Sequence, residues 1–282
     1  MPIISKSKSK SKSKSKSKCT HPPTSIALRR TFRDNKRFWL TLVAATLFCA
    51  HIQRDPARRS VRVAAISLTI AAVVGWLVHM LSHSVDFAAT YTHIRDNSPT
   101  FTRIAHLVPP LDYLVEHGIC YYADFHHKVH HDSAINKDFV NSITEFVQNI
   151  FTQGLGLALW LRGSGGSVHL NYAAFFLYGL LYATVHIINY GIHPSTCHEQ
   201  HHHNDRTNLG IDFLDVLFGT KHNLGDVEDV NHYATNLAAI CIAFYFLMRY
   251  STTHHTTNTW SDTLLRPIAN LVMGPGPGPT TV

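Results

Sequence analysis

Apolar residues gather into four runs along the chain, and polar, histidine-rich segments separate them. The second run, Val63–Leu81, is long enough for a helix that crosses a hydrocarbon core about 30 Å thick, which takes about 20 residues. The other runs are Phe38–Ile52, Phe146–Leu161 and Leu170–Ile188, and the single Gly and Thr residues within them are tolerated in membrane helices. The pattern therefore predicts an all-α fold, an integral membrane helical bundle of about four spans. A soluble all-helical protein is the alternative, and the mean hydropathy of −0.03 is compatible with it.

Basic residues flank the first run and set the expected orientation. The group that precedes Phe38 consists of Arg29, Arg30, Arg33, Lys36 and Arg37, and a smaller group follows Ile52. By the positive-inside rule the N-terminal side is expected in the cytoplasm. Two helical hairpins would then bring the polar segments 82–145 and 189–233 to that same face. We therefore expect a histidine-rich cytoplasmic helical cap on the membrane bundle.

Histidine carries the candidate chemistry, because the chain has 22 His against 18 acidic residues. One pair lies four residues apart at the end of the second apolar run. Two later segments share the spacing H-x-x-H-H, which puts three imidazoles on one face of an α-helix. These eight histidines are His79 and His83, then His127, His130 and His131, then His198, His201 and His202.

Other histidines complete or border this set. His186 ends the fourth apolar run and is a ninth candidate ligand, and His193 is a further candidate. His126 would point about 100° away from His127 on an α-helix, which favours a role behind the ligands or in solvent. Nine imidazoles exceed the needs of one metal ion and predict a di-metal site. Imidazole suits Zn, Cu, Ni or Fe. Glu199 stands in H-E-Q-H, so the H-E-x-x-H zinc motif is absent.

Composition adds the domain boundaries and excludes one class of partner. The net charge is +7, but seven Lys lie in the Ser-Lys repeat from Ser5 to Lys18, which leaves 18 basic against 18 acidic residues elsewhere. The tail has no aromatic or groove-reading elements, so no nucleic-acid partner is expected. The expected organisation is a disordered tail over 1–30, a membrane domain over 31–250 and a flexible C-terminal tail over 251–282. Five scattered Cys without a C-x-x-C pair predict neither a disulfide scaffold nor a cysteine zinc site.

Together the motifs resemble the fatty acid hydroxylase/sterol desaturase superfamily over about residues 63–221. The resemblance rests on Trp76-x-x-His79-x-x-x-His83, on the two H-x-x-H-H segments, and on a continuation after the last of them. That continuation comprises Asn208-Leu209-Gly210, Asp212, Asp215 and Phe218-Gly219-Thr220. The resemblance implies a membrane-embedded di-iron enzyme that uses O2 and hydroxylates or desaturates a lipid, either a fatty acyl chain or a sterol. It also implies electrons from a partner, such as cytochrome b5 or a reductase, and a place in the endoplasmic reticulum of a eukaryote.

The chain departs from the family pattern between the first two motifs. The gap from His83 to His127 is long, so an insert near 90–118 is expected, and His117 is an alternative to His83 as ligand. Candidates for orienting imidazole N–H groups from behind the ligands are Asp124, Asp132, Asn189 and Asp212. The competing hypothesis is a non-catalytic, histidine-rich metal-binding or metal-transport membrane protein. Transport predicts ligands midway along the spans, whereas these motifs lie at span ends.

Overall fold

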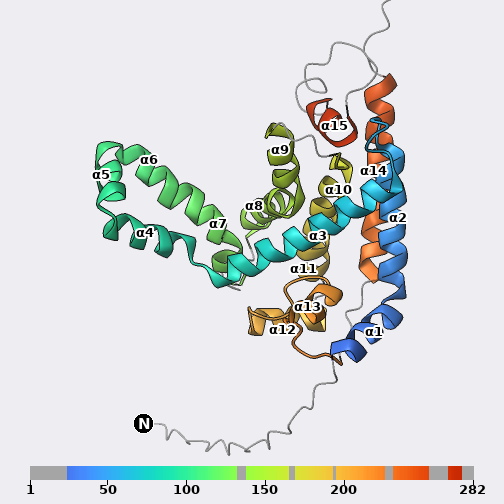
Figure 1. Cartoon of the computed structure of the whole chain (residues 1–282), viewed down its shortest axis with the longest axis horizontal. Coiled ribbons are helices and arrows are strands. Elements are labelled where there is room, and N and C mark those ends of the chain that lie inside the picture. The colour runs from blue at the N-terminus through green and yellow to red at the C-terminus, as the bar shows by residue number, and fades with distance from the viewer. Residues whose placement is uncertain are drawn as a thin grey trace, which may run out of the picture.

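The computed structural model describes residues 24–131, 138–164, 169–192, 195–225, 231–253 and 266–274. Within these residues every regular element is a helix, so the prediction of an all-α fold is confirmed (Figure 1). Two helical stretches are long and apolar enough to cross a membrane. They are α3 (Val61–Ser84) and the continuous stretch Tyr172–Ile192, which contains α10 (Tyr172–Ala183), the π-helical η4 (Thr184–Asn189) and α11 (Tyr190–Ile192).

The helical bundle is built around α10. This helix contacts α3, α2 (Lys36–Ile52) and the continuous helix formed by α8 (Phe139–Ile150), η3 (Phe151–Leu155) and α9 (Gly156–Gly163). The long helix α14 (Asn231–Thr253) packs beside α2 (Figure 1). The core between these helices consists of small and aliphatic side chains, which include Ala45, Cys49, Leu68, Ala174, Leu177, Leu237 and Ile240. Small residues allow helix axes to approach closely, which is a common way to pack helices in membranes.

Two glycines allow η3 and α10 to touch backbone to backbone. A Cβ atom added to Gly154 would lie 2.0 Å from the carbonyl oxygen of Phe175. A Cβ atom added to Gly179 would lie 2.7 Å from the carbonyl oxygen of Ile150. No other residue fits at these positions without moving the helices apart. This contact fixes the face that α8 turns toward the centre of the bundle.

Short helices cover one end of the bundle. They are α1 (Thr24–Asp34), α12 (Thr196–His203) and α13 (Asp212–Phe218), and α1 packs against α13 (Figure 1). The stacked rings of Phe32 and Trp39 meet Phe213 at this junction. Both α3 and the Tyr172–Ile192 stretch end at this cap, so the histidines at their ends come together beneath it.

An arm leaves the bundle between the first two histidine motifs. It comprises α4 (Phe87–Asn97), α5 (Pro99–Leu107), α6 (Pro109–Tyr113), η1 (Leu114–Cys120) and α7 (Tyr121–Phe125), and it projects sideways from the end of α3 (Figure 1). Arg95 joins its two sides by ion pairs to Asp112 and Glu116. The residues of the expected insert, 90–118, form most of this arm.

Both ends of the chain differ from the expected tails. Helix α1 begins at Thr24, so the prediction of a disordered tail is wrong for residues 24–30. Helix α15 (Arg266–Met273) lies against α10, with Val272 and Met273 in the core, so the flexible C-terminal tail is wrong for residues 266–274. The apolar face of this helix is short, and the sequence pattern around it does not predict that it packs against the bundle. The Ser-Lys repeat lies outside the described residues.

Candidate metal centre

A π-helical turn positions the second motif. The segment η2 (His126–His130) follows α7 and has more residues per turn than an α-helix. His126 and His130 therefore lie almost one above the other, with ring planes 13° apart and centroids separated by 4.9 Å. Both are buried, whereas the side chain of His127 is 42% exposed and lies 3.4 Å from Asp205. His126, which we expected behind the ligands, therefore lies among the buried rings with His130. The predicted ligand His127 lies at the edge, in a separate candidate metal group with His83 and Asp205.

The ends of three other helical segments bring the remaining rings to the same place. His79 and His83 are buried on the last turns of α3, and His186 is buried in η4. Helix α12 carries His198, His201 and His202. Ser195 caps that helix, because its hydroxyl accepts a hydrogen bond from the backbone N–H of His198 (3.1 Å).

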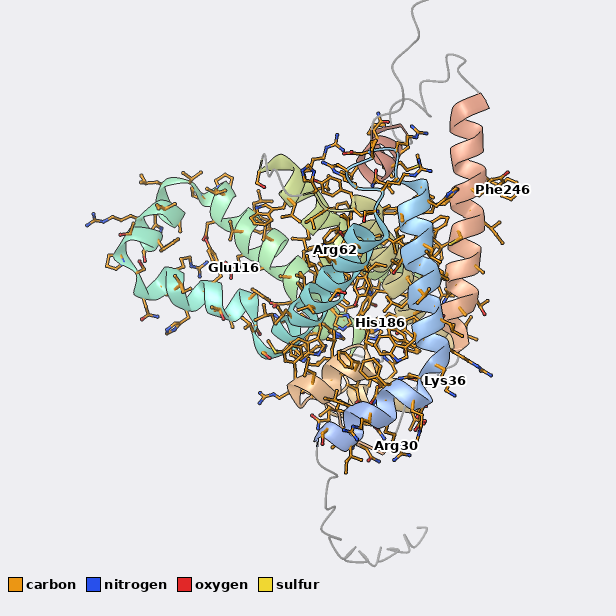
Figure 2. The ribbon with its side chains drawn as sticks, turned by 45° about the vertical axis from the view of Figure 1, so that its right-hand side comes forward. Arg30, Lys36, Arg62, Glu116, His186 and Phe246 are labelled. Carbon is orange, nitrogen blue, oxygen red and sulfur yellow. The ribbon has the colours of Figure 1, made fainter. Side chains whose placement is uncertain are left out.

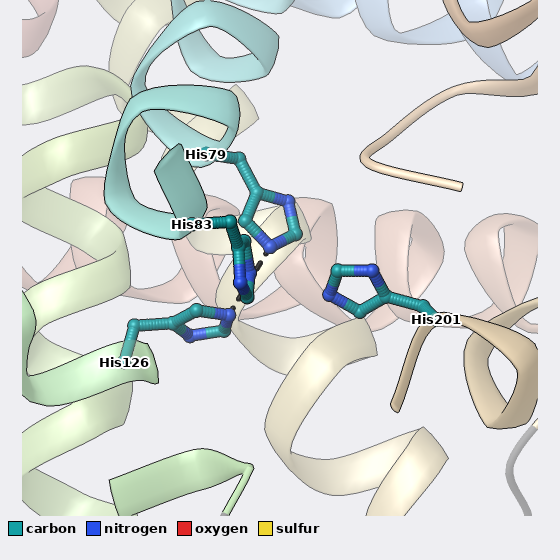
Figure 3. Close-up of side chains that lie close together, drawn as sticks. All are labelled: His79, His83, His126 and His201. Carbon is teal, nitrogen blue, oxygen red and sulfur yellow. Dashed lines mark hydrogen bonds between the residues drawn. The ribbon is translucent and has the colours of Figure 1, made fainter. Parts of the chain in front are cut away.

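Among the described residues, four groups of side chains could each hold a metal ion, and two of them consist of imidazoles alone. The other two are His83 with His127 and Asp205, and His126 with Glu145 and His186. In the first imidazole group, the ring nitrogens of His79, His83, His126 and His201 lie within 4.8 Å of one another, and Figure 3 shows these rings facing a common centre. The second imidazole group consists of His130, His198 and His202. His131 lies between them, with its ring centroid 4.7 Å from His83 and 4.5 Å from His202. His186 lies 4.5 Å from His130 and 4.8 Å from His198 between ring centroids.

Hydrogen bonds to Nδ1 fix which nitrogen of each ring faces the centre. The Nδ1–H of His79 donates to the carbonyl of Leu209, and that of His201 donates to the carbonyl of Thr207 (2.8 Å). A carbonyl can only accept, so the proton is on Nδ1 and the lone pair is on Nε2. A hydrogen bond from Nδ1–H to a carbonyl fixes the tautomer and the ring orientation that a metal ion needs at Nε2.

Glu145 does the same for two rings at once. Its carboxylate accepts hydrogen bonds from Nδ1 of His126 (3.0 Å) and Nδ1 of His130 (2.9 Å), one ring from each imidazole group. The side chain is 1% exposed. Sequence reasoning missed this residue. The available signal was a polar stripe in an apolar segment, since Glu145, Gln148, Asn149 and Gln153 recur every three or four residues along α8 and η3.

Several buried Nε2 atoms that face the cluster have no hydrogen-bond partner. They belong to His83, His130, His131, His186 and His201. An unpaired buried polar atom costs about 1–3 kcal/mol, and a bound metal ion would use these lone pairs. Burial, and then neighbouring imidazoles, hold the pKa values of His126, His131 and His198 well below their ordinary range. Burial also lowers the pKa of His201 and of His202 to about 4. These five rings are therefore neutral at pH 7.

The continuation after the third motif supports the cluster through Asp215. This buried carboxylate accepts hydrogen bonds from Trp76 Nε1 (3.1 Å), the backbone N–H groups of Leu209 (3.0 Å) and Gly210 (3.1 Å), and the Thr220 hydroxyl (2.6 Å). It thereby fastens the loop to α3, one turn before His79. The same loop supplies the Leu209 carbonyl that orients His79, so the motif residues act together.

The other candidates lie at different places. Asp124 accepts from the backbone N–H groups of Phe87 (2.8 Å) and Ala88 (3.0 Å), at the base of the arm. Asp212 pairs with Lys221. The side-chain oxygen of Asn189 accepts from Asn236. None of these hydrogen bonds and ion pairs goes to an imidazole. His117 is exposed and stacks on Tyr113 in the arm, away from the cluster. Asp132 and His193 lie outside the described residues.

An apolar cleft reaches the cluster from the bundle side. Its volume is about 90 Å³. Phe38 and Leu42 of α2, Leu68 of α3 and Leu177 of α10 line it, and His79, His186, His198 and His201 close its inner end. Leu68 and His79 are separated by about 16 Å along α3, at 1.5 Å per residue. The cleft thus offers an extended apolar space that ends on imidazole rings. Comparisons with models of protein families, with curated proteins and with solved structures find no match for this chain.

Proposed function

We propose that this chain is a membrane di-iron oxygenase that hydroxylates or desaturates a fatty acyl or sterol carbon with O2 and electrons from an external donor. The observation that carries the proposal is the apolar cleft that ends on two adjoining groups of mostly buried imidazoles. Apolar substrates of lipid shape fit such a space.

The donor set fits metal ions on structural grounds. Five Nε2 atoms without hydrogen-bond partners face the cluster, and Glu145 orients one ring of each imidazole group. The first ion would be held by His79, His83, His126 and His201, and the second by His130, His198 and His202 with His131 or His186 beside them. Two iron ions would supply the activation of O2 that an attack on a C–H bond requires. Imidazole also binds zinc, copper and nickel, so iron is inferred from the motif spacing together with the cleft.

The residues of the chain account for substrate placement and the exclusion of water. Phe38, Leu42 and Leu177 would contact an aliphatic chain along the cleft. Such contacts remove apolar surface from water at about 25 cal/mol per Å². They also hold one carbon against the imidazole end of the cleft, and position within that end decides between hydroxylation and desaturation.

Apolar side chains on the outside of the bundle support a membrane location. Leu40, Val43 and Leu47 of α2 are more than half exposed, and so are Ile242 and Phe246 of α14. Figure 2 shows Phe246 pointing outward from α14. Side chains of this kind pack against lipid, and they favour α2 and α14 as partners of the two candidate spans within a bundle of about four spans.

The charge distribution supports the expected orientation. Arg30 and Lys36 lie at the cap end of the bundle, close to α12 and α13 (Figure 2). By the positive-inside rule this end faces the cytoplasm. The cluster would then be accessible to a cytoplasmic electron donor such as cytochrome b5 or a reductase, and in a eukaryote the endoplasmic reticulum membrane is the expected location.

Metal analysis and lipid profiling test the proposal together. Purified wild-type protein should hold about two iron ions per chain, and cells that express it should contain a new hydroxylated or unsaturated lipid. His130→Ala should lose the product, while His117→Ala, in the arm, should keep it and the iron. One zinc ion per chain would refute the oxygenase. Tightly bound metal without a His130-dependent lipid product would favour the non-catalytic metal-binding alternative.

A further inference from the structure

A second, polar pocket lies on the other side of His79 from the apolar cleft. Gln148, Asn149, Thr152 and Gln153 line it from α8 and η3, and Ser82 lines it from α3. His79 and Tyr182 line both spaces, so they form the wall between them. His126 faces the polar pocket as well. The pocket therefore reaches the first imidazole group from the side that the cleft does not occupy.

Three side-chain amides in this pocket each have one atom without a hydrogen-bond partner, although the NH2 group of Gln148 donates to the carbonyl of Tyr122. The unpartnered atoms are Gln148 Oε1, Asn149 Nδ2 and Gln153 Oε1, and these residues are 3%, 3% and 4% exposed. Buried amides of this kind are almost always satisfied, either by protein groups or by ordered water. Unlike the Nε2 atoms of the cluster, amide groups of Asn and Gln are poor ligands for the metals that imidazole binds. Another polar molecule is needed to satisfy them.

The size and the opening of the pocket fit water. Its volume of about 30 Å³ exceeds the roughly 10–15 Å³ that an enclosed water requires. The three amide atoms offer both donors and acceptors, which meets the two to four polar partners that a buried water uses. Ser82 and Thr152 are half-buried, and Ser82 lies on the last turn of α3, so the pocket meets the surface near the cap.

We propose that this pocket is a water site that supplies protons to the reaction at the histidine cluster, separately from the path of the lipid. This inference rests on the proposed function. Hydroxylation follows RH + O2 + 2 H⁺ + 2 e⁻ → ROH + H2O, with electrons from the external donor. Desaturation consumes the same protons and electrons and releases a second water. Aliphatic side chains line the outer part of the cleft, whereas water between His79 and the amides of α8 and η3 would offer these protons a polar route.

The position of the Gln153 amide depends on Gly75, one turn before the pocket residues of α3. A Cβ atom added there would lie 2.4 Å from Gln153 Oε1 and 2.9 Å from Tyr178 Cε1. The glycine on α3 thus makes room for the amide of Gln153 within a helix interface that is otherwise apolar. A purely structural contact between α3 and η3 would be served by an aliphatic side chain at position 153.

The test compares Gln153→Met and Asn149→Leu with Thr144→Val, which lies on α8 outside the pocket, all in the full chain in lipid nanodiscs. Thermal unfolding decides whether water is present. In a hydrated pocket the apolar side chains displace water from the remaining amides, and Tm should fall by about 2–4 °C or more per variant. In a dry pocket the same substitutions would remove a buried amide atom without a partner, and Tm should rise. Such a rise would overturn the proposal.

The role in proton supply has its own measurement. With an electron donor and substrate, Gln153→Met should release several-fold more hydrogen peroxide per lipid product than the wild type, and Thr144→Val should not. An unchanged ratio of peroxide to product would overturn proton supply through this pocket. Wild-type protein that makes no lipid product would refute the proposed function and the proton supply with it. The Tm comparison would still decide whether the pocket holds water.

Discussion

Replacement of Glu145 by Gln tests how the protein holds metal without touching a ligand. The carboxylate accepts from Nδ1 of both His126 and His130, at 3.0 and 2.9 Å. The amide of Gln keeps the shape but has a single acceptor oxygen, so its NH2 group must face one of the two Nδ1–H groups. One charge-assisted hydrogen bond is lost, which is worth about 1.5–3 kcal/mol.

Because 1.4 kcal/mol is a factor of ten in affinity, this loss should weaken iron binding about 10- to 100-fold. Removing a hydrogen-bond partner of a metal-binding imidazole has effects of this size. The assay is competition for Fe²⁺ between purified full-length protein and a chelator, read as iron retained per chain. Glu116→Gln is the matched control, because Glu116 pairs with Arg95 in the arm. Equal chelator concentrations for half-release in Glu145→Gln and wild type would refute the reasoning, provided that both proteins remain folded.

Three further predictions concern the ligands, pH and packing. His126→Ala should reduce the iron retained per chain far more than His127→Ala, and equal losses would contradict the placement of His126 among the buried rings. The pKa of His201 is about 4 in the folded state against an ordinary 6.5, so its contribution to stability is fully present above pH 6.5. Metal-free protein should lose about 3 kcal/mol of unfolding free energy through this residue alone as the pH falls from 6.5 to 4. Denaturant unfolding at several pH values measures the loss. Gly154→Ala should lower the free energy of unfolding by at least about 2 kcal/mol because its Cβ meets the backbone of Phe175, whereas Gly163→Ala, with open space around it, should leave the unfolding midpoint unchanged.

The α-helical spacing rule worked where the backbone is α-helical. His79 with His83, and His198 with His201, share a face because α3 and α12 have the regular pitch. It did not single out His126, because His126 with His130 and His127 with His131 are both i, i+4 pairs. Only the packing against Glu145 shows that His126 and His130 are the pair turned toward α8. The apolar runs also located the bundle helices, because a helix that is apolar on most sides can be recognised from its residues alone.

Contacts between distant segments could not be read from the sequence. Glu145 serves His126 and His130 only because the glycine contact at Gly154 turns that face of α8 inward. Helix α15 is short, and its place against α10 depends on a surface that α10 presents only in the folded bundle. Whether Asp124 or Asp212 faces an imidazole is likewise a property of packing, and both bind other groups.

The two ends of the arm meet at its base. Asp124, at its end, accepts from the backbone N–H groups of Phe87 and Ala88, at its beginning. The ion pairs of Arg95 with Asp112 and Glu116 hold the two helical sides of the arm together. An insert whose two ends are bonded to each other can be shortened, lengthened or exchanged for another domain. The helices before and after it then keep their positions. Positions 90–118, which leave this base and the α8 contact of Tyr122 in place, are therefore a natural place for grafting a reporter or an electron-transfer domain beside the histidine cluster.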